Sequence, residues 1–355
     1  MQVVFARCAL TVGLVVVVAG VAAGCGSAVD KAGDSPPAKA RVLTLVAHSD
    51  DEQEWKPFAA AVERLSHGAL RIKVLQNWRD TGTVADITSE RGIVSDVRDG
   101  RVQLGVVGAR VWDTLGVDNF QALIAPFLID SVQLERRALQ TAFAPQALAS
   151  VRREGVVGIA LLPGRLRRPL GVHRRLVAAT DYRGAQIGIR PSRIASLTFR
   201  DLGGRPIAYI PGDLSPFGGS ELDPYTVMAE GFDSYSREMT GNVVLWPKPW
   251  TFVMNRGAFD RLTRSQRQML LEAGREAFAG EVAQVAHDTR AAISTLCHGR
   301  LPFAMASSTD RTALREAVRP VYARIERNRF TRRWIAEIQR LKASTPPDIA
   351  RCSTS

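Results

Sequence analysis

The sequence is poor in residues that bind metals or act as nucleophiles, with 4 cysteines and 5 histidines among its 355 residues. No two histidines stand three or four positions apart, and no pair of cysteines has the spacing of a zinc site. The chain also lacks a GxSxG nucleophile elbow, a GxxxxGK(S/T) phosphate loop and a GxGxxG turn. The adjacent acids Asp50 and Asp51 point in different directions, unlike the opposed carboxylates of a glycosidase. These absences predict a protein that is not an enzyme and holds no metal or cofactor.

An uncharged hydrophobic run extends from Cys8 to Gly24, after a start that has one basic residue. It is slightly short for a membrane span of about 20 residues, and it ends in small residues before Cys25. This segment resembles a bacterial lipoprotein signal, which implies that residues 1–25 are the signal and that Cys25 carries the lipid. An ordinary secretory cleavage and an uncleaved anchor are alternatives, because Ala22 stands where the family usually has a larger aliphatic side chain. All three place the rest of the chain outside the cytoplasm.

The remainder of the chain is long enough for two domains and is strongly basic. Residues 26–40 lack the apolar content to pack, so they are predicted to form a flexible tether. The following part is longer than one hydrophobic core usually spans. The formal net charge of +12 suits anionic headgroups or cell-wall polymers. Nucleic acid is not an expected partner, because no basic stripe alternates with aromatic residues and the chain is exported.

Two cysteines remain when the signal and the lipid-bearing residue are set aside, namely Cys297 and Cys352. Outside the cell, two leftover thiols are more often paired than free. We therefore predict a disulfide between them.

Short β-rich runs alternate with amphipathic helices along the chain. A strand is predicted at 42–46, before a helix whose apolar positions between 55 and 65 recur every three or four residues. This alternation predicts a βαβ arrangement with a mostly parallel sheet that is covered on both faces. The other predicted segments are strands at 70–74, 102–107, 156–162, 185–189, 206–210 and 251–254, and helices at 86–98, 263–297 and, more charged, 310–342.

The order of these segments resembles the solute-binding proteins of tripartite ATP-independent periplasmic (TRAP) transporters, of the dicarboxylate type. The matching pieces include LTLVAH, RLSHGALRIKVL, VRDGRVQLGVVGARVW, APFLID and WTFVMNRGAFDRLTRSQRQMLLEAGREA. The resemblance implies a two-domain α/β fold of the periplasmic-binding-protein kind, with a hinge and a ligand enclosed between the domains. The implied first domain is 41–165 plus about 251–280, and the second is 166–250 plus about 281–345. A separate membrane permease is the implied partner.

The departures from the family concern the substrate. In the family, a strand reading roughly Lys-Ile-Arg-Val-Pro has an arginine that holds the substrate carboxylate in a bidentate pair. That arginine falls here on Gly188, and Arg190 lies two residues on, about 6 to 7 Å away on the same face of a strand. Arg190 is therefore predicted to hold the ligand from a shifted position, with a surface charge as the alternative. Asp223 replaces a neutral asparagine of the family, which favours an amine or a hydroxyl-rich ligand over an acid.

Further residues are predicted to face the ligand. Arg167, in a run of arginines, has the best spacing for the family's second arginine, with a solvated basic face as the alternative. Trp246 and Trp250 stand where the family has aromatics beside the ligand, which suits a ring, a sugar face or a cation. For Trp250, core packing is the alternative. Trp78 and His48 follow predicted strands, at the end where open α/β sheets bind ligands, with a turn or cap role as the alternative.

These observations predict a lipid-anchored solute-binding protein that captures a small polar metabolite, an organic acid or a related compound, and delivers it to a TRAP-type permease. Two alternatives belong to other classes of protein. One is a ligand-sensing module that docks on a receptor. The other is a cell-wall interaction lipoprotein with a collapsed cleft, which the loss of the family's arginine at 188 and the short 212–220 segment favour.

Overall fold

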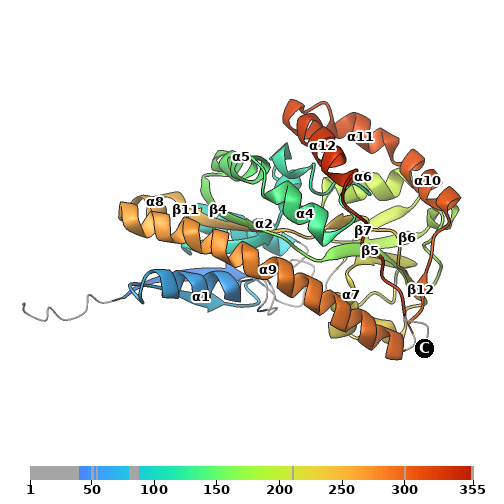
Figure 1. The fold of residues 1–355 in the computed structure, drawn as a ribbon, viewed down its shortest axis with the longest axis horizontal. Helices are drawn as coiled ribbons and strands as arrows, with labels where there is room; N and C mark the ends of the chain where they lie inside the picture. Colours follow the sequence, from blue (N-terminus) through green and yellow to red (C-terminus); the bar gives the residue numbers. More distant parts are fainter. Residues whose placement is uncertain are drawn as a thin grey trace, which may run out of the picture. The chain divides into compact units, whose positions relative to one another are not determined.

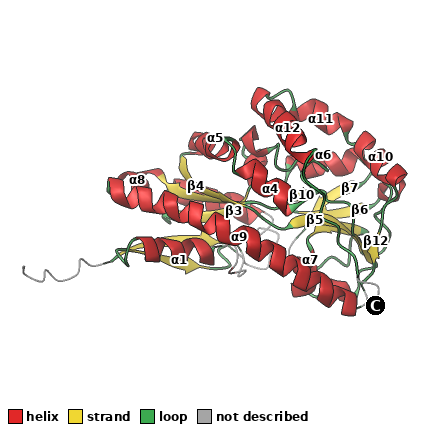
Figure 2. Cartoon of the chain, in the orientation of Figure 1, coloured by secondary structure: helices red, strands yellow, loops and turns green. Residues whose placement is uncertain are grey.

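The computed structural model describes residues 40–48, 52, 55–79, 88–209, 212–299 and 301–352. Its strands form two sheets, here called the first and the second sheet, with helices packed against both (Figure 1, Figure 2). The predicted signal, with Cys25, and all but the last residue of the predicted tether lie outside the described residues. Among the described helices, none combines the length and the apolar character that a membrane crossing requires.

The first sheet combines early strands with one strand from much later in the chain. Its strands are β1 (Arg41–Ala47), β2 (Leu70–Leu75), β3 (Leu104–Gly108), β4 (Val156–Leu162) and β11 (Trp250–Asn255). Their order in the sheet is β2-β1-β3-β11-β4. β1 is parallel to β2 and β3, whereas β11 is antiparallel to β3 and β4. Within the described residues, β4 is therefore an edge strand.

Helices cover both faces of the first sheet, because its strands are apolar on both sides. The covering helices are α1 (Lys56–Leu65), α2 (Ser89–Arg98), α5 (Phe143–Ser150), α8 (Arg256–Asp260) and α9 (Arg264–His298). Leu45 of β1 packs in one core with Phe58 of α1 and Leu270 of α9. The next residue, Val46, packs in a different core with Ile93 of α2. Successive side chains of a strand point to opposite faces, so one apolar strand supplies both cores.

The second sheet is built mainly from the middle of the chain. Its strands are β5 (Leu166–Gly171), β6 (Gln186–Ile189), β7 (Arg205–Ala208), β8 (Gly219–Leu222), β9 (Glu238–Thr240), β10 (Trp246–Pro247) and β12 (Phe303–Ala304). Their order is β12-β9-β5-β8-β6-β7, with β10 beside β5. β6 is parallel to β7 and β8, but β5 runs antiparallel to β8, β9 and β10. A mostly parallel arrangement was therefore a correct prediction for β1 to β3 and for β6 to β8, and a wrong one around β5 and β11.

The remaining helices lie mostly against the second sheet or between the two sheets. They are α3 (Val111–Thr114), α4 (Val132–Leu139), α6 (Arg193–Asp201), α7 (Pro224–Ala229), α10 (Ser308–Ala317), α11 (Arg319–Ile325) and α12 (Arg329–Lys342). The last of these gather over α6 and α4 (Figure 2). The single charged helical end predicted at 310–342 is divided into α10, α11 and α12. Pro320 stands in the first turn of α11, and the Asn328 side chain caps α12, so the chain turns at both places.

Helix α9 runs from the first sheet to the second (Figure 1). The Thr263 side chain caps its start by accepting from the backbone N–H of Gln266. Ala273 lies in the core of the first sheet, and Leu296, near the other end, lies in a core of the second. Cys297 forms a disulfide with Cys352, with their Cα atoms 5.6 Å apart, which ties the end of α9 to the C-terminal segment.

The backbone also crosses between the sheets at Gly164, between β4 and β5, and again between β10 and β11. The N–H of Gly164 donates to Glu135 Oε1 at 3.0 Å, and the N–H of Lys248 donates to the carbonyl oxygen of Arg165 at 3.0 Å. A Cβ atom added to Gly164 would overlap the carbonyl oxygen of Lys248. The two connections therefore touch through their backbones.

Candidate functional site

Two side chains from different sheets meet at the ends of their strands. His48 follows β1 of the first sheet, and Arg190 follows β6 of the second. Arg190 Nη2 lies 2.7 Å from His48 Nε2, and Arg190 is only 5% exposed. Its other terminal nitrogen, Nη1, is buried and has no hydrogen-bond partner among the described residues. Arg190 is therefore not the surface charge that the sequence left open.

His48 is held as a neutral ring. A guanidinium group only donates hydrogen bonds, so Nε2 accepts from Arg190 and the proton lies on Nδ1, 3.0 Å from Ser89 Oγ. Burial, and then the charge of Arg190, lower the pKa of His48 to about 3. His48 therefore gives Arg190 a hydrogen bond without a counter-charge.

The depressed pKa of His48 predicts that the protein loses stability in mild acid. The unfolded chain takes up a proton on this residue near pH 6.5, whereas the folded chain does so only near pH 3. Stability therefore falls as the pH drops below 6.5, by up to about 1.4 kcal/mol per pH unit. Urea unfolding at pH 7 and pH 5 measures this loss, and His48→Gln, which keeps an acceptor for Arg190, should lose less. Equal losses in the two proteins would contradict the assigned protonation state.

A buried ion pair lies next to these two residues in the first sheet. Glu90, in the first turn of α2, accepts from the N–H of Gly108 at 2.8 Å and forms an ion pair with Arg110. Burial alone would raise the pKa of Glu90, but the charges of Arg110 and then Arg190, with the hydrogen bond from the Gly108 N–H, lower it to about 2. Glu90 is therefore a carboxylate that balances Arg110. Neither residue of this pair was predicted from the sequence, where the only signal was the position of Glu90 in the first turn of a predicted helix.

The second sheet contributes another buried ion pair beside the site. Arg167 of β5 donates from Nη1 to the carbonyl oxygen of Glu221 at 2.7 Å and to its Oε2 at 3.1 Å. Both residues are buried, with 4% and 1% of their surface exposed, so the alternative of a solvated basic face is wrong for Arg167. Asp223 is also buried, and it caps α7 by accepting from the N–H and the hydroxyl of Thr226. Burial would raise the pKa of Asp223, but Arg165, Arg167 and Lys248 lower it, so Asp223 is charged and already surrounded by cations.

Two of the three tryptophans predicted to face the ligand lie in cores. Trp246 is 4% exposed and meets Phe199 edge to face, with ring centroids 5.9 Å apart. Trp250, also 4% exposed, packs with Phe252 in a core of the first sheet, and the ammonium of Lys248 lies 4.1 Å from the centre of its ring. Trp250 thus has the core packing that was its alternative, and one face of its ring meets the ammonium of Lys248.

Aromatic rings fill the space above Gly188. A Cβ atom added there would come within 3.1 Å of the Phe217 ring and 3.2 Å of the Tyr209 ring. The rings meet at 61° with centroids 5.9 Å apart. Burial raises the pKa of Tyr209, although Arg167 and Arg190 oppose the shift, so its hydroxyl is a neutral group close to both arginines. An arginine at 188 has no room in this chain, and neither ring had a sequence signal beyond the unusual loop that contains Phe217.

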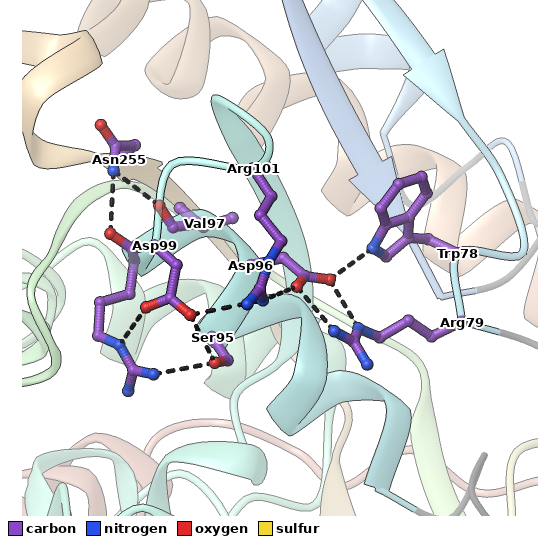
Figure 3. Close-up of polar contacts among 9 residues, drawn as sticks. Trp78, Arg79, Ser95, Asp96, Val97, Asp99, Arg101 and Asn255 are labelled. Carbon is purple, nitrogen blue, oxygen red and sulfur yellow. Dashed lines mark hydrogen bonds and ion pairs between the residues drawn. The ribbon is translucent and has the colours of Figure 1, made fainter.

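Trp78 takes part in a different network, shown in Figure 3. Its indole N–H donates to Asp96 Oδ2 at 2.8 Å, and Arg79 donates to the same carboxylate at 2.6 and 2.7 Å. The contacts of Trp78 and Arg79 tie the segment after β2 to α2. Arg101, just after α2, also donates to Asp96 Oδ1, at 2.6 Å. The polar atom of Trp78 is therefore engaged inside the first-sheet half of the protein, a contact that agrees with the turn role that was its alternative, and its place beside a ligand stays a prediction.

Asp113 connects the two halves next to Arg190. It lies in α3, after the first-sheet strand β3, and is 1% exposed. Its carboxylate accepts from the Ser192 hydroxyl at 2.8 Å and from the N–H groups of Arg193 at 3.0 Å and Ile194 at 2.9 Å. These donors form the start of α6, where a negative charge is favourable. The turn that presents Arg190 is thus held from the first-sheet side.

Comparisons with known proteins identify the family and the fold. A family profile described as bacterial extracellular solute-binding protein, family 7 (DctP), matches residues 44–328. A TRAP periplasmic solute-binding protein from Roseobacter denitrificans with bound β-D-glucuronate superposes with a TM-score of 0.74 at 16% identity, over 84% of this chain and 99% of that chain. The sugar acid binding protein DctPAm from Advenella mimigardefordensis, in complex with galactonate, gives 0.75 at 18% identity, over 85% and 99%. Among curated proteins, none matches the sequence.

The matched region covers most of the chain, so the chain belongs to this family of bacterial extracellular solute-binding proteins. Its fold is the two-domain α/β fold of TRAP periplasmic solute-binding proteins, which confirms the fold and the family inferred from the order of segments. Members of the family act outside the cytoplasm by binding a small molecule for transport, and not by catalysis. In the described part of the chain, no three His, Cys, Asp or Glu side chains are grouped as a metal site.

Proposed function

We propose that the ligand is a small hydroxylated acid with one negative charge, bound between the two sheets with its carboxylate on Arg190. The buried guanidinium of Arg190 carries this proposal, because its Nη1 has no partner among the described residues and its Nη2 meets only a neutral ring. Burying a charge without a counter-charge is unfavourable, and a planar guanidinium matches the two oxygens of a carboxylate. A bound carboxylate supplies both the missing hydrogen bonds and the missing charge.

The charges around Arg190 support a ligand with a single negative charge. Each neighbouring cation among the described residues has an acidic residue beside it. The pairs are Arg110 with Glu90, Arg167 with Glu221, Arg165 with Asp288, and Lys248 with Asp223. Arg190 is the cation left over. A second carboxylate on the ligand would meet Glu90, Glu221 or Asp223 with no further cation to balance it.

The partners of Asp223 remove the main argument for an amine ligand. Its two carboxylate oxygens already accept from Thr226, and the nearby cations lower its pKa. The neutral hydroxyl of Tyr209, placed near Arg190 and Arg167, suits a hydroxyl group of the ligand. Relatives with this fold bind glucuronate and galactonate, which combine one carboxylate with several hydroxyl groups.

We further propose that the protein works by closure of two domains over the ligand, as its family membership implies. The two sheets are the cores of two domains, with the bounds 41–165 plus about 251–280 and 166–250 plus about 281–345, that close over the ligand. Contacts made only in the closed state, such as that of His48 with Arg190, favour closure. The loaded protein delivers its ligand to a TRAP-type permease, and a lipid on Cys25 holds it at the membrane.

Replacement of Arg190 tests the proposal. D-galactonate at a hundred times its dissociation constant should stabilise residues 26–355 by about 2.7 kcal/mol, seen as a rise of several degrees in Tm. Arg190→Gln should weaken binding about a hundredfold or more, because two charge-assisted hydrogen bonds are lost. Arg153→Gln, a change of the same kind at an exposed position, is the matched control. Equal affinity in Arg190→Gln and the control would refute the role of Arg190. No rise in Tm with any member of a panel of sugar acids would refute the ligand class.

A further inference from the structure

A cavity lies at the outer edge of the first sheet. Its volume is about 730 Å³, within the range of small-molecule pockets. Helix α5 forms one wall, helices α8 and α9 form the other, and the edge strand β4 forms the floor. None of the residues around Arg190 lines it. The cavity is therefore separate from the site described above.

The lining of this cavity is mostly apolar and includes several small residues. Five consecutive residues of β4, Val157 to Leu161, line the floor. Residues from both faces of a strand share one cavity only where the cavity follows the strand's edge. Gly274 of α9 packs so closely on Ala160 that an added Cβ would come within 2.7 Å of the Ala160 Cβ. The half-buried rings of Phe259 and Phe278 form an apolar rim.

The shape of the cavity floor indicates whether a peptide strand or a hydrocarbon chain fits there. An exposed sheet edge invites an added peptide strand. The pairing of β4 with β11 shifts register between Phe252 and Val253, which leaves Ile159 as an extra residue in β4. Such a bulge bends the edge and interrupts its regular hydrogen-bonding groups. The space therefore suits a flexible hydrocarbon chain better than an extended peptide.

Two charged residues in the lining indicate which polar group an occupant of the cavity would have. They are Arg152, just after α5, and Arg275 on α9, and both are exposed. Arg275 has Glu272 as an ion-pair partner, whereas Arg152 has no ion pair among the described residues. An anionic group at the mouth of the cavity would form an ion pair with Arg152, while a hydrocarbon chain attached to it fills the apolar space.

We propose that this cavity is a second ligand site, for an amphipathic carboxylate with an unbranched hydrocarbon chain, that is, a compound of the fatty-acid class. Its carboxylate lies by Arg152 and its chain runs along β4 between α5 and α9. The site binds independently of the hydroxylated acid at Arg190.

Calorimetric titration with sodium decanoate, below its micelle concentration, tests this site in residues 26–355. Wild type is expected to bind one decanoate, and Arg152→Glu to bind it at least tenfold more weakly. The neighbouring Arg153→Glu makes the same charge change at an exposed position that does not line the cavity, so it is expected to bind like wild type. Decanol, which has the chain without the charge, is expected to bind at least tenfold more weakly than decanoate.

A second pair of variants tests where the hydrocarbon chain of decanoate lies. Ala149→Trp fills the cavity from an exposed position of α5 and should abolish decanoate binding, whereas Ala142→Trp, exposed but not in the lining, should leave it unchanged. Retained thermal unfolding with an unchanged Tm in both variants shows that they fold. Saturating D-galactonate should not change the decanoate affinity. Absence of decanoate binding, equal binding in Arg152→Glu and Arg153→Glu, retention in Ala149→Trp, or competition with galactonate would each overturn the proposal.

Discussion

Replacement of Gly164 by alanine is expected to lower the free energy of unfolding by about 3 kcal/mol or more, at the upper end of what overpacking does. The added Cβ would overlap the carbonyl oxygen of Lys248, which belongs to the other connection between the sheets. Neither backbone can move away freely, because Lys248 N–H bonds to the Arg165 carbonyl and Gly164 N–H bonds to Glu135. Urea unfolding followed by far-UV circular dichroism measures the change.

The matched control is Gly280→Ala, the same substitution inside α9. An added Cβ at Gly280 has no atom within 4 Å. Alanine is the better helix former, so this variant should gain about 1 kcal/mol. If Gly164→Ala were as stable as wild type, the close contact of the two connections would be wrong.

Removal of Arg167, one partner of a buried ion pair, is expected to be strongly destabilising. Arg167→Met leaves Glu221 buried without its cation, which costs about 3–5 kcal/mol. The same substitution at Arg340, whose ion pair with Glu337 is exposed, should cost about 1 kcal/mol or less. Chemical unfolding of both variants measures the contrast.

The double variant Arg167→Met with Glu221→Leu separates pairing from packing. Replacing both charges by apolar side chains should recover a large part of the loss, because no uncompensated charge remains. A double variant less stable than Arg167→Met alone would show that Glu221 stabilises the fold by contacts other than this pair.

The elements with strong local signals could be predicted from the sequence. The strand 156–162 has the bounds of β4, and the helix predicted at 263–297 differs from α9 by one residue at each end. Both are long or uniformly apolar, and α9 begins with a capping box that is visible in the sequence. Local patterns of this kind need no knowledge of what packs against them.

The strands β5 and β8 were missed for a physical reason. β5 reads Leu-Arg-Arg-Pro-Leu-Gly, which has the polarity of a surface turn. Its arginines can be buried because they donate hydrogen bonds to distant parts of the sequence. Arg167 donates to Glu221, and Arg168 donates to the carbonyl oxygens of Gly241 and Asp348. These partners lie 54 to 180 positions away, so no local pattern announces them.

The site was predictable in part, for a similar reason. The rule that ligands bind at strand ends brought His48 to attention, the family resemblance brought Arg190, and the structure places them 2.7 Å apart. Glu90, Arg110 and Tyr209 come from other segments and were not singled out. Whether Arg190 has a counter-charge depends on the positions of these residues around it, and those positions follow from the fold and not from any local pattern.

The most direct test of the account is one calorimetric comparison of three ligands that share a hydroxylated six-carbon chain. Galactitol is uncharged, D-galactonate has one carboxylate and galactarate has two. A site with one unmatched cation, Arg190, should bind D-galactonate most tightly, with galactarate at least about tenfold weaker and galactitol about a hundredfold weaker. If galactarate or galactitol bound as tightly as D-galactonate, the single unmatched charge would not be what selects the ligand.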